Sequence, residues 1–200
     1  MKRLFALVCA LVLVSVTASA QELSKEDREK GVKYLEETRD GVVAAVSGLS
    51  DAQMHFKAGP DRWSVAECLE HIALAEDFLF MNVTQNVMKA GPGAPDRDYA
   101  KADAMVLAMI PDRSHKAQAP PQLVPTSRWT PDEALKHFLA SREKTIEYMK
   151  TESSLRMHVA DSPLGQPLDA YEWLLFIGAH SKRHTEQIDE VKADANFPKM

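Results

Sequence analysis

The chain has 200 residues, of which 45% are hydrophobic and 26% are charged. This balance indicates a single globular domain and excludes a disordered chain, which would be poorer in apolar residues. The formal net charge is −5 and no basic cluster is present, so the chain is a poor candidate for binding nucleic acid or anionic lipid. Only 8 glycines and few runs of β-branched residues argue against an all-β fold.

The first 20 residues have the pattern of a secretory signal peptide. It begins with two basic residues, Lys2 and Arg3, which are followed by a short apolar stretch over residues 4–16. A small-residue cleavage pattern, Ala18-Ser19-Ala20, comes after that stretch. We therefore expect residues 1–20 to be removed by cleavage near Ala20. Residues 21–200 would then form an exported domain, periplasmic or extracellular. An uncleaved N-terminal anchor is the alternative.

The rest of the chain carries no second apolar segment long enough to cross a bilayer, so we expect no stable membrane span. Loss of Lys2 and Arg3, with no acidic residue in the leader, changes the net charge from −5 to −7. Cys9 leaves with the leader and Cys68 remains alone, which excludes an internal disulfide. The core or a bound ion must therefore stabilise the mature protein.

Apolar residues at three- and four-residue steps predict a first helix over about residues 25–49, with Ser24 as its N-cap. A second helix is predicted over about residues 65–89. Ser64 and Glu67 form an S-x-x-E capping box at its start, and a Gly-Pro-Gly turn follows its end.

Residues 91–130 are the least regular part of the chain and are rich in proline. Asp98 to Ile110 can hold a short helix within them. The segment is longer than a hairpin loop, so it can carry the chain along the length of the molecule. In that case the helices before and after it run parallel.

A third helix is predicted over about residues 131–152, where Thr130 and Glu133 form the capping box. Its buried stripe consists of Leu135, Phe138, Arg142, Ile146 and Met149. The fourth is predicted over about residues 170–193, with Asp169 as its cap. Four amphipathic helices of this length predict an all-α four-helix bundle.

The fourth helix carries the most informative pair of residues. His180 and His184 are four positions apart, which places both on one helix face. They interrupt an apolar stripe that includes Trp173, Ile177 and Ile188. Imidazoles in a core need hydrogen-bond partners or a metal ion. Such a pair also arises by chance, so it does not by itself establish a metal site.

A third histidine, His71, lies on an apolar face of the second helix. Two histidines from one helix and one from a facing helix supply three nitrogen ligands. Three protein ligands and one open position are typical of a reactive zinc site, and bundle cores often hold such sites. We therefore predict that His71, His180 and His184 bind one divalent metal ion.

These two segments also resemble a known family. The carrying residues are Trp63-Ser64-Val65 with His71, and His180, Arg183, His184, Gln187 and Ile188. They resemble the DinB-like superfamily, in particular the YfiT-type metal-dependent hydrolase family, over essentially the whole mature chain. The resemblance implies an up-down-down-up bundle with a long connection between helices two and three. It also implies a three-histidine site that often holds zinc or nickel, and frequent homodimers.

The resemblance implies a hydrolase or transferase acting on a small molecule, without naming that substrate. Some relatives resemble thiol-dependent transferases or isomerases of the cytosol, and the export signal argues against that role here. A non-catalytic metal-binding or stress-related bundle is the alternative. A third possibility is that the histidines are ordinary core groups without an ion.

Several neighbours of the histidines are candidates for a supporting role. Cys68 lies one turn before His71 and is within reach of an ion, although a cysteine there is more often a small buried apolar group. Glu67 can orient His71, but its capping role already explains it. Glu186 and Asp189 are candidates to bind the second ring nitrogen of a ligand histidine.

Overall fold

The computed structural model describes residues 22–114 and 116–199, so the expected leader, residues 1–20, lies outside the described part of the chain. The described residues are predominantly helical, and the predicted all-α fold is confirmed. In chain order the elements are α1 (Lys25–Val46), α2 (Asp51–Met54), α3 (Val65–Gln85), the short 3₁₀ helix η1 (Val87–Lys89), α4 (Tyr99–Met109), η2 (Pro121–Leu123), α5 (Pro131–Thr151), β1 (Val159–Ala160), β2 (Leu168–Asp169) and α6 (Ala170–Lys192).

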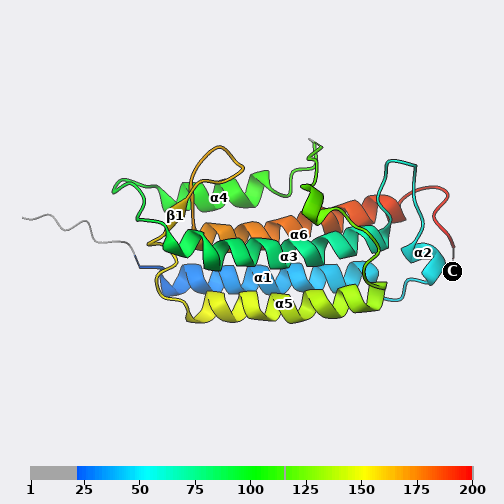
Figure 1. The fold of residues 1–200 in the computed structure, drawn as a ribbon, viewed down its shortest axis with the longest axis horizontal. Helices are drawn as coiled ribbons and strands as arrows, with labels where there is room; N and C mark the ends of the chain where they lie inside the picture. The colour runs from blue at the N-terminus through cyan, green and yellow to red at the C-terminus, as the bar shows by residue number, and fades with distance from the viewer. Residues whose placement is uncertain (1–21, 115, 200) are drawn as a thin grey trace, which may run out of the picture.

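The long helices α1, α3, α5 and α6 lie side by side as a bundle (Figure 1). α1 packs against α5 and α6, and α3 packs against the same two helices. Tyr171 donates to the Asp27 carbonyl near the start of α1, and Lys192 donates to the Ala45 carbonyl near its end. α1 and α6 therefore run in the same direction. α3 and α5 run the opposite way, which confirms the up-down-down-up course (Figure 1).

The connection between α3 and α5, residues 86–130, makes this course possible because it returns the chain along the bundle (Figure 1). The short helix predicted within it is present as α4, which begins after the cap Asp98 and packs against α6. The connection therefore covers part of the α3–α6 side of the molecule before α5 begins.

The helix starts follow the predicted caps. Ser24 caps α1, and Ser64, Thr130 and Asp169 each form a capping box with the glutamate three residues later. A short antiparallel pair of strands, β1 and β2, precedes α6 and was not predicted. These strands are only two residues long and show no extended alternating pattern in the sequence.

Two helix ends come earlier than predicted. α1 ends at Val46 rather than Leu49, because Gly48 adopts a left-handed φ of 73° that turns the chain out of the helix. α3 ends at Gln85 rather than Lys89, and the remaining residues form η1. Apolar periodicity continues across both breaks, so it does not mark them.

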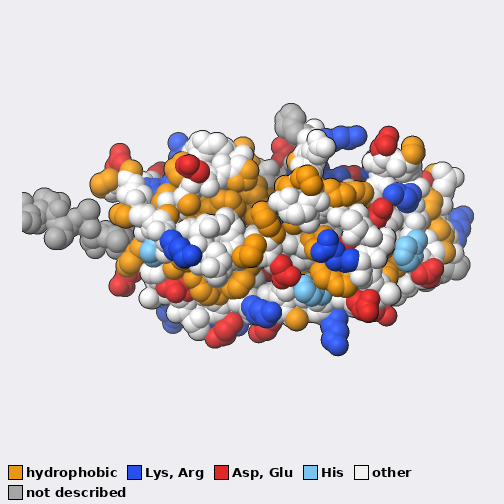
Figure 2. Space-filling view, viewed as in Figure 1, with side chains coloured by type: hydrophobic (Ala, Val, Ile, Leu, Met, Phe, Trp, Pro, Cys, Tyr) orange, Lys and Arg blue, Asp and Glu red, His pale blue; other side chains and the backbone are white. Residues whose placement is uncertain are grey.

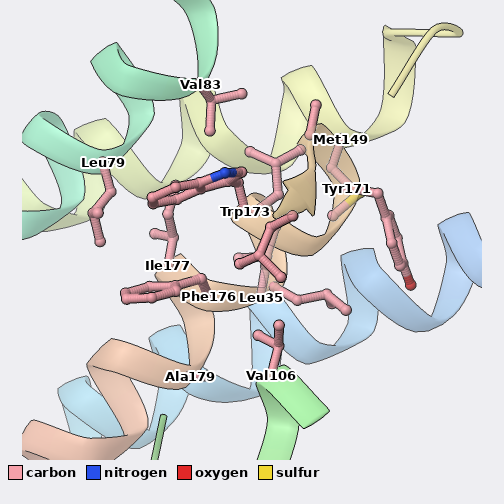
Figure 3. Packing of buried hydrophobic residues seen from close by; sticks show 14 of the residues in the cluster. Leu35, Leu79, Val83, Val106, Met149, Tyr171, Trp173, Phe176, Ile177 and Ala179 are labelled. Carbon is pink, nitrogen blue, oxygen red and sulfur yellow. The ribbon is translucent and has the colours of Figure 1, made fainter. Parts of the chain in front are cut away.

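Two hydrophobic clusters fill the bundle, one toward each end. The first contains Leu35, Met149, Trp173 and Ile177 (Figure 3). The second includes Phe138 and lies toward the start of α3 and the end of α6. The middle of the helices carries buried polar side chains instead: Thr38, His71, Glu76, Arg142, Thr145, Ser181 and His184. The candidate histidines are therefore part of a polar layer between two apolar halves.

Figure 2 shows acidic and basic side chains interspersed over one face of the molecule, with apolar side chains gathered along its middle, over α4 and η2. Within the described residues, no helix combines the length and the apolar character needed to cross a membrane.

Candidate metal centre

Three histidines from two helices meet in the middle of the bundle. His71 lies on α3, and His180 and His184 lie one turn apart on the antiparallel α6. The Nε2 atom of His71 is 3.2 Å from Nε2 of His180 and 3.1 Å from Nε2 of His184. The three candidate ligand atoms all lie within 4.8 Å of one another. The structure thus brings together the three residues that the sequence singles out.

The tautomer of His71 follows from its second ring nitrogen. Nδ1 lies 2.8 Å from the carbonyl oxygen of Leu123, in η2. A carbonyl only accepts hydrogen bonds, so Nδ1 carries the hydrogen. Burial lowers the pKa of the His71 imidazole below its ordinary value, so the ring is neutral near pH 7. Nε2 of His71 therefore presents a lone pair to the other two histidines.

His184 has the same orientation. Its Nδ1 lies 2.8 Å from Oε1 of Gln187, and Nη1 of Arg113 approaches the same oxygen at 3.4 Å. A guanidinium only donates, so this atom is the carboxamide oxygen and His184 Nδ1 is the donor. Burial, followed by the nearby His71, lowers the pKa of His184 to about 3. Its Nε2 is therefore also an unprotonated acceptor.

The two lone pairs face each other, an arrangement that a cation between them would satisfy. The Nε2 atoms of His71 and His184 are 3.1 Å apart with no hydrogen to share. Nitrogens bound to a metal at about 2.0–2.1 Å lie roughly 3.3 Å apart at tetrahedral corners and roughly 3.0 Å apart at adjacent octahedral corners. The two spacings that involve His71, 3.1 and 3.2 Å, fit nitrogen ligands of one divalent transition metal and do not distinguish these two geometries.

His180 is the most exposed of the three histidines. His71 and His184 are buried, whereas His180 keeps partial contact with solvent. Burial, followed by His184 and then His71, holds the pKa of His180 well below its usual value, so this ring is neutral as well. The part of the cluster nearest to solvent is therefore His180.

Cys68 does not join the cluster. The group of ligand atoms within reach of one another contains only the three histidines among the described residues. Cys68 is fully buried, and burial raises the pKa of its thiol to about 12, so it stays protonated. The structure thus places Cys68 as a small apolar core group.

Trp63 packs beside two of the three histidines. Its ring centroid lies 4.8 Å from that of His71 and 6.1 Å from that of His184. The indole precedes the cap of α3, so the start of this helix places it directly beside the ligands. The indole therefore forms part of the apolar surroundings of His71 and His184.

The connection between α4 and α5 is held against both ligand helices. On α3, Glu70 accepts hydrogen bonds from the backbone amides of Thr126 at 2.9 Å and Arg128 at 3.5 Å. On α6, Arg183 donates to the carbonyls of Ile110 and Asp112. The connection is therefore part of the centre, because it also supplies the Leu123 carbonyl.

The partners of the ring nitrogens differ from those expected from the sequence. Glu186 lines a surface groove with residues of α1, and the exposed Asp189 pairs with Lys192, so neither supports a ligand. Gln187 takes that role for His184. Glu67 keeps only its capping role and an ion pair with Lys57. In the sequence, the feature that could have identified Gln187 as the partner of His184 is their spacing of three residues on one helix.

The partner of His71 carried no such signal. It is the main-chain carbonyl of Leu123, about 50 residues further along the chain. Every residue offers a carbonyl, so residue type does not identify the one that reaches the ring. Only the path of the connection across the bundle determines it.

Comparisons with known proteins agree with this architecture. The chain is 29% identical over 151 residues to the uncharacterized protein YuaE of Bacillus subtilis (strain 168), covering 74% of this chain and 88% of YuaE. Its fold is similar to that of YfiT from Bacillus subtilis, reported as a probable metal-dependent hydrolase with an unusual four-helix bundle topology. That match has a TM-score of 0.55 and 16% identity, over 88% of this chain and 91% of YfiT. The family model of the DinB superfamily matches residues 34–188, and the chain belongs to this superfamily.

Proposed function

We propose that this chain is an exported DinB superfamily protein that binds one divalent metal ion, zinc or nickel, through His71, His180 and His184. We further propose that it acts as a metal-dependent hydrolase or transferase on a small molecule. The observation that carries the proposal is the convergence of three Nε2 atoms, with that of His71 3.1–3.2 Å from the other two and the lone pairs of His71 and His184 facing each other. The similarity to YfiT, reported as a probable metal-dependent hydrolase, supports the hypothesis of hydrolase activity.

The residues around the three histidines have different roles in the proposed site. The Leu123 carbonyl and Gln187 hold two rings with Nε2 inward. Trp63 packs against the His71 ring, and a substrate would approach by way of the partly exposed His180. An ion held there would supply Lewis acidity to a substrate oxygen.

Metal content tests the proposal most directly. Protein beginning at Gln21 is purified without chelator and analysed by mass spectrometry for the wild type, His180→Ala and His55→Ala. His55 is an exposed histidine at the C-cap of α2 and serves as the control. We expect about one ion per chain in the wild type and the control, and loss of the ion in His180→Ala. A wild type that stays metal-free after reconstitution would refute the site.

Cys68→Ser separates an open centre from one closed by a fourth protein ligand. Because the thiol lies outside the ligand cluster, we expect the metal affinity of this variant to stay within a few-fold of wild type. A large loss of affinity would instead favour the non-catalytic alternative, in which the ion only stabilises the bundle. With an open centre established, ester, amide and phosphoester hydrolysis are screened in the wild type and in His180→Ala.

The leader sequence supports export. N-terminal sequencing of the protein recovered from the native host tests it, and a start near Gln21 is the expected result. A chain recovered with the membrane and still carrying its first residues would point to the uncleaved anchor.

A further inference from the structure

Gln187 occupies a distinctive position beside the candidate metal centre. It lies three residues after His184 on α6, so its side chain sits next to that ring. Its carboxamide oxygen accepts the hydrogen of His184 Nδ1 at 2.8 Å. This contact determines which nitrogen of His184 is free, and with it the direction in which the lone pair points.

The carboxamide is itself held in place. Arg113, from the connection after α4, donates to the same oxygen at 3.4 Å. Its guanidinium also makes two hydrogen bonds to Glu190, of 2.7 and 2.8 Å. Glu190 receives a further hydrogen bond from Arg62 at 3.2 Å. Arg113 is thus fixed by a paired carboxylate, and it keeps the Gln187 oxygen, rather than the amide nitrogen, turned toward His184.

We propose that Gln187 is a positioning residue for the metal centre, which orients His184 for metal binding and is held in that orientation by Arg113. The role rests on the proposed metal binding by the three histidines. Gln187 does not touch the metal or the substrate, and it acts through the ring that it orients. Hydrogen-bond acceptors on the second nitrogen of a ligand histidine commonly change metal affinity by about 10- to 100-fold.

A surface glutamine of α6 with no such role would behave differently. In that case Gln187→Met would leave metal affinity unchanged, because an exposed helical glutamine contributes little to its surroundings. Gln85, the exposed last residue of α3, provides the matched control for the same substitution. Gln187→Glu keeps an acceptor oxygen in place and tests for rescue.

The experiment uses Co²⁺ as the probe, because its visible absorption reports the geometry of the ligands. The full mature chain is titrated with Co²⁺ in competition with a chelator for the wild type, Gln187→Met, Gln187→Glu, Arg113→Met and Gln85→Met. We expect Gln187→Met to weaken Co²⁺ binding about 10- to 100-fold and to alter the absorption bands. Arg113→Met should show a smaller loss in the same direction, and Gln187→Glu should bind close to wild type.

Thermal unfolding of the metal-free variants shows whether each one folds, so a loss of affinity in a folded Gln187→Met protein is specific. The role is overturned if Gln187→Met keeps wild-type affinity and spectrum, or if Gln187→Glu binds as weakly as Gln187→Met. Failure of the wild type to bind Co²⁺ at all would overturn the proposed function instead, and this role with it.

Discussion

Among single residues, Arg142 is the most tightly constrained. Its guanidinium is fully buried, and two of its nitrogens donate to the carboxylate of Glu76 at 2.9 and 2.6 Å. The other donors reach the Leu35 carbonyl, Thr38 and Ser181. All five N–H groups are therefore satisfied, and one side chain of α5 connects α1, α3 and α6, reaching Ser181 next to His180.

Arg142→Met tests how much this layer contributes to stability. Removing the guanidinium leaves Glu76 buried without its counter-charge, which typically costs about 3–5 kcal/mol. We expect a fall of that order in the free energy of unfolding, measured by urea denaturation. Lys136→Met, an exposed position on the same helix, should change it by less than about 0.5 kcal/mol. Equal effects in the two variants would contradict the assigned role.

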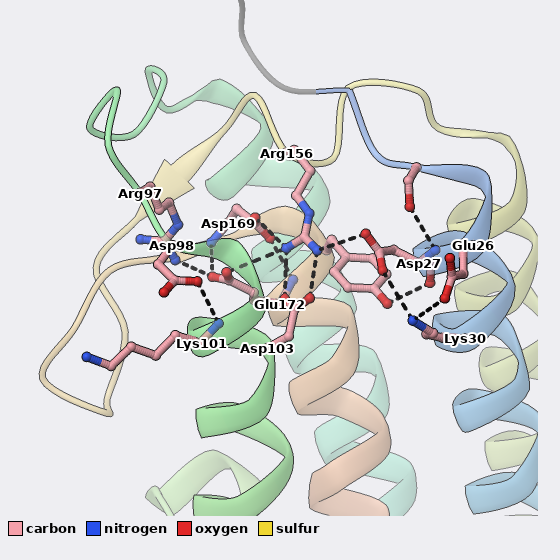
Figure 4. A network of polar contacts seen from close by, with 12 residues as sticks. Glu26, Asp27, Lys30, Arg97, Asp98, Lys101, Asp103, Arg156, Asp169 and Glu172 are labelled. Carbon is pink, nitrogen blue, oxygen red and sulfur yellow. Dashed lines mark hydrogen bonds and ion pairs between the residues drawn. The ribbon is translucent and has the colours of Figure 1, made fainter.

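A second buried network lies at the end of the bundle where α1 and α6 begin (Figure 4). Arg156 binds Asp103 at 2.7 Å and Asp169 at 2.9 Å, and Arg97 pairs with Glu172. Asp27 also lies 3.9 Å from Arg156, so four carboxylates face two guanidiniums here and negative charge is in excess. Burial, followed by Asp169, raises the pKa of Glu172 to about 7.

This shift predicts a pH dependence of stability. The pKa of Glu172 rises from 4.5 to about 7 on folding, so the folded state binds the proton more tightly than the unfolded state. The stability that this tighter proton binding gives to the folded state is fully present below about pH 4.5 and is lost as the pH rises toward 7. We therefore expect the free energy of unfolding of the wild type, measured relative to that of Glu172→Gln, to fall by about 2 kcal/mol from pH 5 to pH 8. A constant difference would show that Glu172 does not titrate in this range.

At the scale of elements, the connection between α4 and α5 is held against the bundle by hydrogen bonds to α3. It combines proline-rich backbone with two contacts to α3, from the buried Glu70 carboxylate and from His71. A long segment without regular structure ordinarily moves easily. Here the buried carboxylate accepts main-chain hydrogen bonds, which hold the segment across the ligand helices.

Glu70→Ala should therefore loosen this connection without unfolding the bundle. We expect faster trypsin cleavage at Arg113 and Arg128, while the helical circular dichroism stays unchanged. Glu147→Ala, an exposed position on α5, is the matched control and should be cleaved at the wild-type rate. Unchanged cleavage in Glu70→Ala would mean that other contacts suffice to hold the segment.

At the scale of the whole molecule, two apolar halves meet at a polar layer. The three histidines and the Arg142–Glu76 pair occupy the level where the hydrophobic clusters end. A bound ion would join α3 to α6 at this level. Metal binding should therefore stabilise the whole bundle, because the converging ligands exist only when both helices are packed.

Metal removal tests this coupling. Free metal at 100 times the dissociation constant should raise the free energy of unfolding by about 2.7 kcal/mol. Chelator should reverse the gain in the wild type, seen as a lower thermal midpoint. His180→Ala should respond to neither treatment. If the thermal midpoint of the wild type changed with neither metal nor chelator, no ion would bind the folded chain.

The amino-acid sequence by itself determined the helices, their caps and the ligand candidates. Capping boxes and apolar periodicity are local, so Ser64, Thr130 and Asp169 mark helix starts correctly. The same periodicity placed Arg142 and the histidines on buried stripes. The resemblance to the DinB-like superfamily supplied the up-down-down-up course, which the long connection permits and periodicity alone does not specify.

Only the tertiary structure decided how these groups are satisfied. The Leu123 carbonyl, the Arg113–Gln187 contact and the partners of Arg142 join residues that are far apart in the chain. Helical periodicity gives the face on which a side chain lies, but not the atom that meets it. That atom depends on how helices pack and where the connection crosses them. These contacts determine which lone pairs face one another, and hence where an ion fits.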